Sequence, residues 1–96
     1  MKVLFSKRAA KGLEKIFSHV VKNFTQAQAQ VVRDELVASI LKLSKFPDLG
    51  SKIAVQADKR VLVVSGNQIV YEIVLRAEPV IVIRNIRRRR MQAAKT

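Results

Sequence analysis

The chain has 96 residues, which is enough for one domain and too few for two, so we expect a single domain over residues 1–96. It contains no cysteine and one histidine, which excludes disulfide frameworks, thiolate zinc sites, thiol nucleophiles and multi-histidine metal sites; we expect no cofactor. Nineteen lysines and arginines against seven acidic residues give a formal net charge of +12, which predicts an anionic partner: nucleic acid, an acidic protein or a membrane surface.

No stretch of the sequence resembles a membrane-spanning or secretory segment. A transmembrane helix needs about 18 or more predominantly apolar residues, and no run of that length is free of charges. The apolar run near the N-terminus, residues 3–5, is too short for the core of a signal peptide. We therefore expect a cytoplasmic protein without a membrane partner.

The first quarter of the sequence predicts a short strand followed by a helix. Residues 2–6 combine β-branched and aromatic side chains and end in Ser6, a residue type favoured at helix N-caps. Apolar residues then recur at three- and four-residue intervals up to Phe24, which is typical of an amphipathic helix. Inside it, Gly12 indicates either close packing at that point or a tolerated weakening of about 1 kcal/mol relative to Ala.

A second helix is predicted to begin at Thr25, because Thr25 and Gln28 have the spacing of a capping box. Pro47 ends it. Since only about two residues connect the two helices, we expect them to fold back as an antiparallel hairpin. The second helix also carries extra apolar residues that a binding partner could cover: Val31, Val37 and Leu41.

The second half of the sequence predicts antiparallel strands. Turn signals at residues 65–67 and 77–79 separate three short runs rich in Val and Ile: residues 60–64, 69–75 and 80–86. Consecutive strands joined by such short turns pair antiparallel, as a meander. The last run is apolar on both faces, so we expect it to be central in the sheet or covered on both sides.

The predicted fold class is α+β. Residues 51–57 alternate in polarity and predict one more strand at the front of the meander. The elements then form an N-terminal strand and an antiparallel helical hairpin packed on a three- to four-stranded antiparallel meander sheet. The sheet gains a further strand if the N-terminal segment joins its edge. A basic C-terminal tail over residues 87–96 follows.

Short motifs occur in a fixed order along nearly the whole chain. They are Phe-Ser-Lys-Arg-Ala at residues 5–9, Phe-Pro-Asp-Leu-Gly at 46–50, Arg-Val-Leu at 60–62 ahead of Ile-Val-Tyr-Glu-Ile at 69–73, and Val-Ile-Val-Ile-Arg-Asn-Ile-Arg at 80–87. With the order of the elements, they resemble the RelE/ParE superfamily of toxins from bacterial type II toxin–antitoxin systems. The resemblance implies a small toxin that a cognate antitoxin protein holds inactive, in a toxin–antitoxin hetero-oligomer.

Two activities occur in this superfamily: RelE-like members cut messenger RNA in the ribosomal A site, and ParE-like members poison DNA gyrase. Metal-independent RNA cleavage needs a proton acceptor, a proton donor and cations around the phosphate. The basic tail has no tyrosine, and Arg87 stands where family members often have histidine; a guanidinium is a poor general base. We therefore favour a ParE-like gyrase inhibitor. The alternatives are a RelE-like ribosome-dependent mRNA endonuclease and a non-toxic basic nucleic-acid-binding member.

Cations near the last strand and the turn before the sheet are the candidates for target binding. Four consecutive arginines follow Ile86, and in an extended chain they alternate between both faces, where their forked groups suit phosphates or carboxylates. The alternative is a solvated run that keeps the sheet edge soluble. No catalytic residue is identified. The predicted target-binding residues are Lys52, Arg60, Arg84, Arg87, Arg88, Arg89 and Arg90.

Other residues are expected to be structural. Tyr71 is expected in the core with a hydrogen-bonded hydroxyl, and Pro47 and Gly50 form the turn after the second helix. His19 is expected at the helix surface, not in catalysis, because nothing near it in sequence completes a proton relay. The alternative to target binding by Arg60 is that it is solvated or forms an exposed ion pair with its neighbour Asp58.

Overall fold

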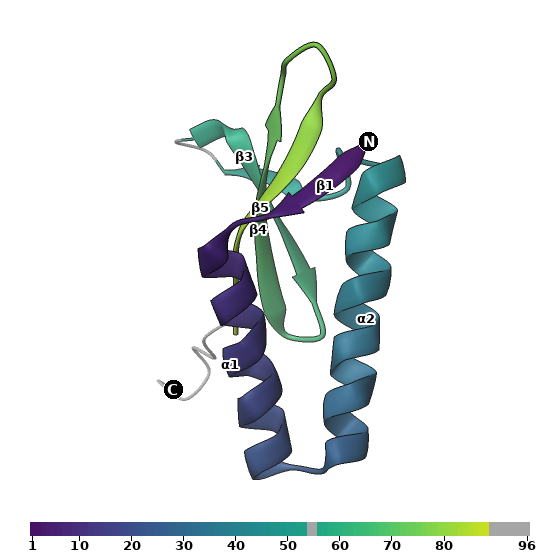
Figure 1. The fold of residues 1–96 in the computed structure, drawn as a ribbon, viewed down its shortest axis with the longest axis vertical. Helices are drawn as coiled ribbons and strands as arrows, with labels where there is room; N and C mark the ends of the chain where they lie inside the picture. The colour runs from purple at the N-terminus through teal and green to yellow at the C-terminus, as the bar shows by residue number, and fades with distance from the viewer. Residues whose placement is uncertain (54–55, 89–96) are drawn as a thin grey trace, which may run out of the picture.

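The computed structural model describes residues 1–53 and 56–88 of the chain. Arg89 and Arg90, with the rest of the predicted tail, lie outside the described residues, whereas Arg87 and Arg88 belong to the last strand. No helix in the described ranges is long and apolar enough to cross a membrane. In chain order the elements are β1 (Lys2–Phe5), α1 (Lys7–Asn23), α2 (Gln26–Lys45), β2 (Ser51–Ile53), β3 (Gln56–Val64), β4 (Asn67–Val74) and β5 (Val80–Arg88) (Figure 1).

The strands form one five-stranded mixed sheet in the order β1-β5-β4-β3-β2. Strands β2 to β5 pair antiparallel, as the predicted meander. Strand β1 joins the edge beside β5 and runs parallel to it, with Lys2 opposite Val80 and Phe5 opposite Ile83. The α+β class is confirmed, and the sheet is larger than three to four strands because the N-terminal segment joins it. As expected, β5 lies inside the sheet, between β1 and β4.

Strand β3 begins earlier than the sequence predicts. Its start at Gln56, instead of residue 60, takes in Lys59, which lies opposite Glu72 of β4. Polar residues at the start of a strand are compatible with pairing when they lie on a solvated face or edge. The hydrophobic run therefore marks only part of this strand.

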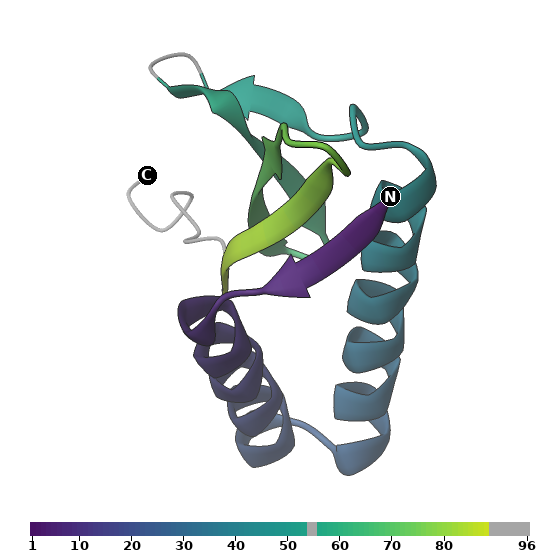
Figure 2. The same cartoon turned by 45° about the horizontal axis from the view of Figure 1, so that its top comes forward.

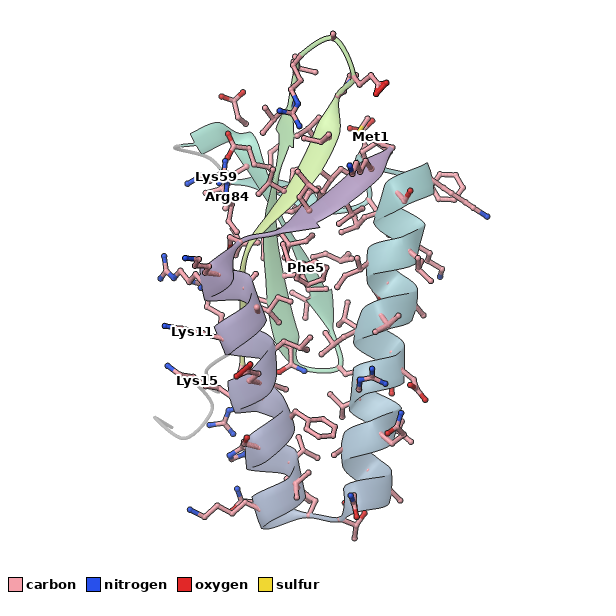
Figure 3. The ribbon with its side chains drawn as sticks, viewed as in Figure 1. Met1, Phe5, Lys11, Lys15, Lys59 and Arg84 are labelled. Atoms are coloured by element: carbon pink, nitrogen blue, oxygen red, sulfur yellow. The ribbon has the colours of Figure 1, made fainter. Side chains whose placement is uncertain are left out.

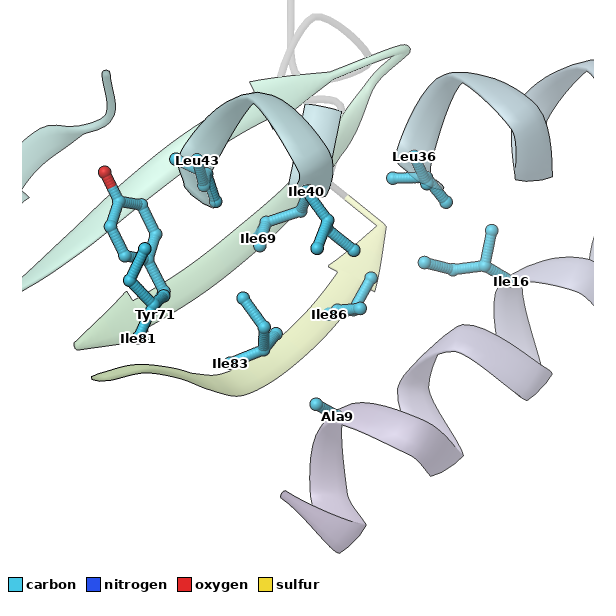
Figure 4. Close-up of a cluster of buried hydrophobic side chains, with 10 residues drawn as sticks. All are labelled: Ala9, Ile16, Leu36, Ile40, Leu43, Ile69, Tyr71, Ile81, Ile83 and Ile86. Atoms are coloured by element: carbon cyan, nitrogen blue, oxygen red, sulfur yellow. The ribbon is translucent and has the colours of Figure 1, made fainter. Parts of the chain in front are cut away.

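Both helices pack on one face of the sheet and run antiparallel as a hairpin (Figures 1 and 2). Burying each large aliphatic side chain of this core stabilises the fold by about 1.5–3 kcal/mol. A register shift between β4 and β5 leaves Arg84 as an extra residue, so that Ile83 and Ile86 both reach the core. The core cluster in Figure 4 comprises Ala9, Ile16, Leu36, Ile40, Leu43, Ile69, Tyr71, Ile81, Ile83 and Ile86.

The two predicted helix starts are confirmed by their hydrogen bonds. The backbone N–H of Ala9 donates to the Ser6 hydroxyl oxygen at 3.0 Å, and that hydroxyl donates to the carbonyl of Arg84 on β5 at 2.9 Å. Thr25 and Gln28 form the complete capping box, with distances of 3.1 and 3.2 Å between the side chain of one and the backbone N–H of the other. Ser6 therefore both caps α1 and ties it to β5.

Helix α1 approaches β5 very closely at Gly12. A Cβ atom at this position would lie 1.9 Å from the carbonyl oxygen of Ile86. Of the two interpretations of this glycine, close packing is therefore the correct one. The contact brings the basic side of α1 beside the end of β5.

We predict that Gly12→Ala lowers the free energy of unfolding by about 1–3 kcal/mol, because the added methyl group forces α1 away from β5. This is opposite to the gain of about 1 kcal/mol that alanine normally brings to a helix. Urea unfolding followed by circular dichroism measures the difference. Ser18→Ala, at an exposed position of the same helix, is the control and should not destabilise the protein. A Gly12→Ala variant at least as stable as the wild type would contradict the close contact.

Candidate functional site

The described candidates for target binding lie in three separate places. Lys52 and Arg60 are opposite one another on β2 and β3, beside the turn that follows α2. Arg84 is in the middle of β5 and forms an ion pair with Glu72 at 2.8 Å. Arg87 and Arg88 are at the end of β5. The structure does not gather all these cations into one site.

Arg60 contacts the turn after α2 and stabilises it. Its Nη1 donates to the carbonyl oxygen of Gly50 at 2.7 Å, and its Nη2 lies 3.3 Å from a carboxylate oxygen of Asp48. The side chain is only 17% exposed. The ion-pair partner is therefore Asp48, and not Asp58 as the sequence suggested, because the turn folds back over β3. Target binding by Arg60 or by the exposed Lys52 stays a prediction.

Tyr71 fixes the same turn from inside the core. Its hydroxyl donates to the carbonyl of Pro47 at 2.7 Å and accepts the backbone N–H of Gly50 at 2.8 Å. A Cβ atom at residue 50 would lie 2.8 Å from this hydroxyl and 2.9 Å from the carbonyl of Val61, so only glycine fits there. Burial raises the pKa of Tyr71 above its ordinary value of 10.0, and the Gly50 N–H and the Arg60 charge oppose that rise.

The arginines at the end of β5 join a basic face of α1. The groove between these elements has a volume of about 610 Å³; of the described residues that line it, six are cations and none is a carboxylate. Figure 3 shows Lys11 and Lys15 projecting from α1 on the side away from α2. We call this the cationic groove; its charged residues are Lys7, Arg8, Lys11, Lys15, Arg87 and Arg88.

The spacing of the lysines explains how α1 forms one wall of the groove. Residues four apart lie one above the other on a helix, so Lys7, Lys11 and Lys15 share a face while the apolar residues turn toward the core. An adjoining hollow continues this face to His19 and Lys22, and its described lining includes one carboxylate, that of Glu14. The four-residue spacing of the lysines is visible in the sequence. That these lysines lie beside the end of β5 is not, because it depends on how the elements pack.

His19, which lines the adjoining hollow, contacts an arginine of the cationic groove. The Arg88 guanidinium donates to Nε2 of the imidazole, and Nδ1 lies 3.1 Å from the side-chain nitrogen of Asn23. Sequence reasoning missed this contact because 69 positions separate the two residues. In the described ranges no three His, Asp or Glu side chains are grouped to hold a metal ion. The chemistry these residues offer is therefore anion binding, with one imidazole at its edge.

Comparisons with known proteins agree with this fold. A family model described as the ParE toxin of the type II toxin–antitoxin system parDE matches residues 3–93. Among solved structures, a chain of the chromosomal ParDE system from P. aeruginosa is 18% identical and superposes with a TM-score of 0.77, covering 94% of this chain and 97% of that one. At 18% identity, this similarity shows that the two chains share a fold. None of the curated proteins compared with the chain matches it.

We predict that Tyr71→Phe lowers the free energy of unfolding by about 1–3 kcal/mol at neutral pH, because it leaves a buried N–H and a carbonyl without this partner. Since the folded-state pKa is raised, the tyrosine's contribution is complete below its ordinary pKa of 10.0 and is lost as pH rises through the folded-state value. Urea unfolding at increasing pH should therefore show the gap between wild type and variant narrowing above about pH 10. A gap that stays constant would exclude this role of the hydroxyl.

Proposed function

Because the chain belongs to the ParE toxin family of type II toxin–antitoxin systems, we propose that it inhibits DNA gyrase and that a cognate antitoxin protein neutralises it in the cytoplasm. The family supplies the toxin assignment. The choice of gyrase as the target depends on the chemistry of the site.

The observation that supports gyrase inhibition is the composition of the cationic groove. Its charged side chains are lysines and arginines, which bind anions well and transfer protons poorly at neutral pH. The hydroxyl of Tyr71 is fully buried and has both a donor and an acceptor partner in the turn after α2, so it does not face the groove. Such a site favours a toxin that acts by binding over one that cuts a phosphodiester bond.

One observation favours the second candidate function, ribosome-dependent cleavage of messenger RNA. The contact of His19 with Arg88 brings an imidazole to the groove, and imidazole is the side chain best suited to proton transfer near neutral pH. The complete reaction still requires a second group, which donates a proton if the imidazole accepts one, or accepts a proton if the imidazole donates one. Primer extension on messenger RNA after induction separates the two functions: A-site cuts would support cleavage, and an intact transcript pool would exclude it.

The exposed apolar surface of the helical hairpin supports an antitoxin partner. Val31, Val37 and Leu41 on α2 are 56%, 42% and 65% exposed, as the sequence led us to expect. A mostly apolar groove also runs between the two helices, where Leu13 and Phe17 of α1 are among the lining residues. Exposed apolar patches of this kind mark contacts with other proteins. An amphipathic antitoxin segment would cover them.

We predict that the wild-type protein blocks DNA supercoiling by purified gyrase and leaves broken DNA, and that Arg87→Gln with Arg88→Gln weakens this inhibition about tenfold or more. Each lost charge-assisted hydrogen bond is worth about 1.5–3 kcal/mol, enough for that factor. Lys42→Gln with Lys45→Gln removes the same charge from the exposed end of α2 and should inhibit like the wild type. Unchanged supercoiling and intact DNA with the wild-type protein would exclude gyrase as the target.

A further inference from the structure

We propose that the cationic groove binds the phosphate backbone of duplex DNA directly, so that the protein associates with DNA in the absence of gyrase. This inference rests on the proposed function, since it names the partner of the same site. It uses both walls of the groove, the lysine face of α1 and the arginines that end β5.

The charges of the groove are available to an outside anion. In the described ranges the two ion pairs join Arg60 to Asp48 and Arg84 to Glu72, and neither uses a groove side chain. Two of the three groove arginines, Arg87 and Arg88, donate to neutral groups: the Gln68 amide and the His19 imidazole. A guanidinium has five N–H donors, so each arginine keeps donors for a phosphate. Among the described residues, six positive charges thus face one channel, and none of them is paired with a carboxylate.

The described part of the groove offers no exposed apolar anchor of the kind that a protein partner requires. Its two isoleucines, Ile16 and Ile86, are 3% and 0% exposed and lie beneath the charged side chains. Protein interfaces depend on a few apolar or aromatic residues that are desolvated at their centre. The strongly exposed apolar residues lie elsewhere, for example Leu41 on α2 and Leu75 after β4. An acidic peptide would therefore gain charge contacts here and little burial, whereas a polyphosphate needs only the charges.

The rigidity of the groove favours a duplex over a single strand. From Lys7 to Lys22 the basic face of α1 extends over about 22 Å at a rise of about 1.5 Å per residue. Duplex DNA presents about one charge per 1.7 Å of its axis, so about 13 phosphates lie along that length. Gly12 holds this straight row against β5. Single-strand binders instead stack bases on aromatic side chains, and none of the groove residues that the structure describes is aromatic.

The test is the binding of the full-length protein to a fluorescently labelled duplex of mixed sequence, measured by fluorescence anisotropy between about 50 and 200 mM salt. With about four to six phosphate contacts, the slope of log K against log salt should be about −3.6 to −5.4, at −0.9 per contact. Lys11→Gln with Lys15→Gln should make the slope about 1.8 units shallower, independent of the DNA sequence. Lys42→Gln with Lys45→Gln, the charge-matched control on α2, should leave it unchanged.

Three results would overturn the inference: no binding to the duplex at about 50 mM salt, equal loss of binding in the α2 control, and tighter binding to single-stranded RNA or to an acidic peptide than to the duplex. Supercoiling assays on the same preparations keep the two proposals distinct. If the wild type inhibits gyrase but does not bind free duplex, this inference fails and the proposed function stands. If it binds duplex and leaves gyrase active, the proposed function fails and the inference stands.

Discussion

The close contact between Gly12 and the carbonyl of Ile86 is the constraint on which the arrangement of the site depends. Because residue 12 has no side chain, α1 lies directly against the backbone of β5. This contact positions Lys11 and Lys15 on the same channel as the end of the strand. The glycine weakens the helix locally by about 1 kcal/mol, and the packing it allows offsets that cost. The absence of a side chain at residue 12 thus allows the close packing of α1 on β5 and, with it, the position of the charged surface above.

The arginines of the sheet differ in their contacts: two form ion pairs with carboxylates, and two line the cationic groove. Arg60 and Arg84 are held by carboxylates, the first at the turn after α2 and the second across β4 and β5. Arg87 and Arg88 lie beyond the reach of those carboxylates and line the groove instead. The turn itself is fixed by the buried hydroxyl of Tyr71. The charges of Arg60 and Arg84 are thus paired with carboxylates, whereas among the described residues no ion pair involves a charge of the groove.

Local features of this fold were predictable from the sequence, and long-range ones were not. The N-cap at Ser6 and the capping box at Thr25 depend on neighbours within three residues, so their spacing alone identifies them. The parallel pairing of β1 with β5 joins the two ends of the chain, and no turn signal marks it. The pairing of Arg60 with Asp48 depends on how the turn after α2 folds back, which the sequence does not show. The contact between His19 and Arg88 likewise required the packing of α1 on β5.

In the proposed complex with DNA, α1 and the end of β5 act together as one phosphate-binding surface. The most direct test is a titration of isotope-labelled protein with a short DNA duplex, followed through the backbone amide signals in NMR spectra. We expect the shifts to concentrate on residues 7–22 and 84–88, with both segments responding at the same DNA concentration. Shifts confined to one segment, or centred on the exposed face of α2, would contradict it.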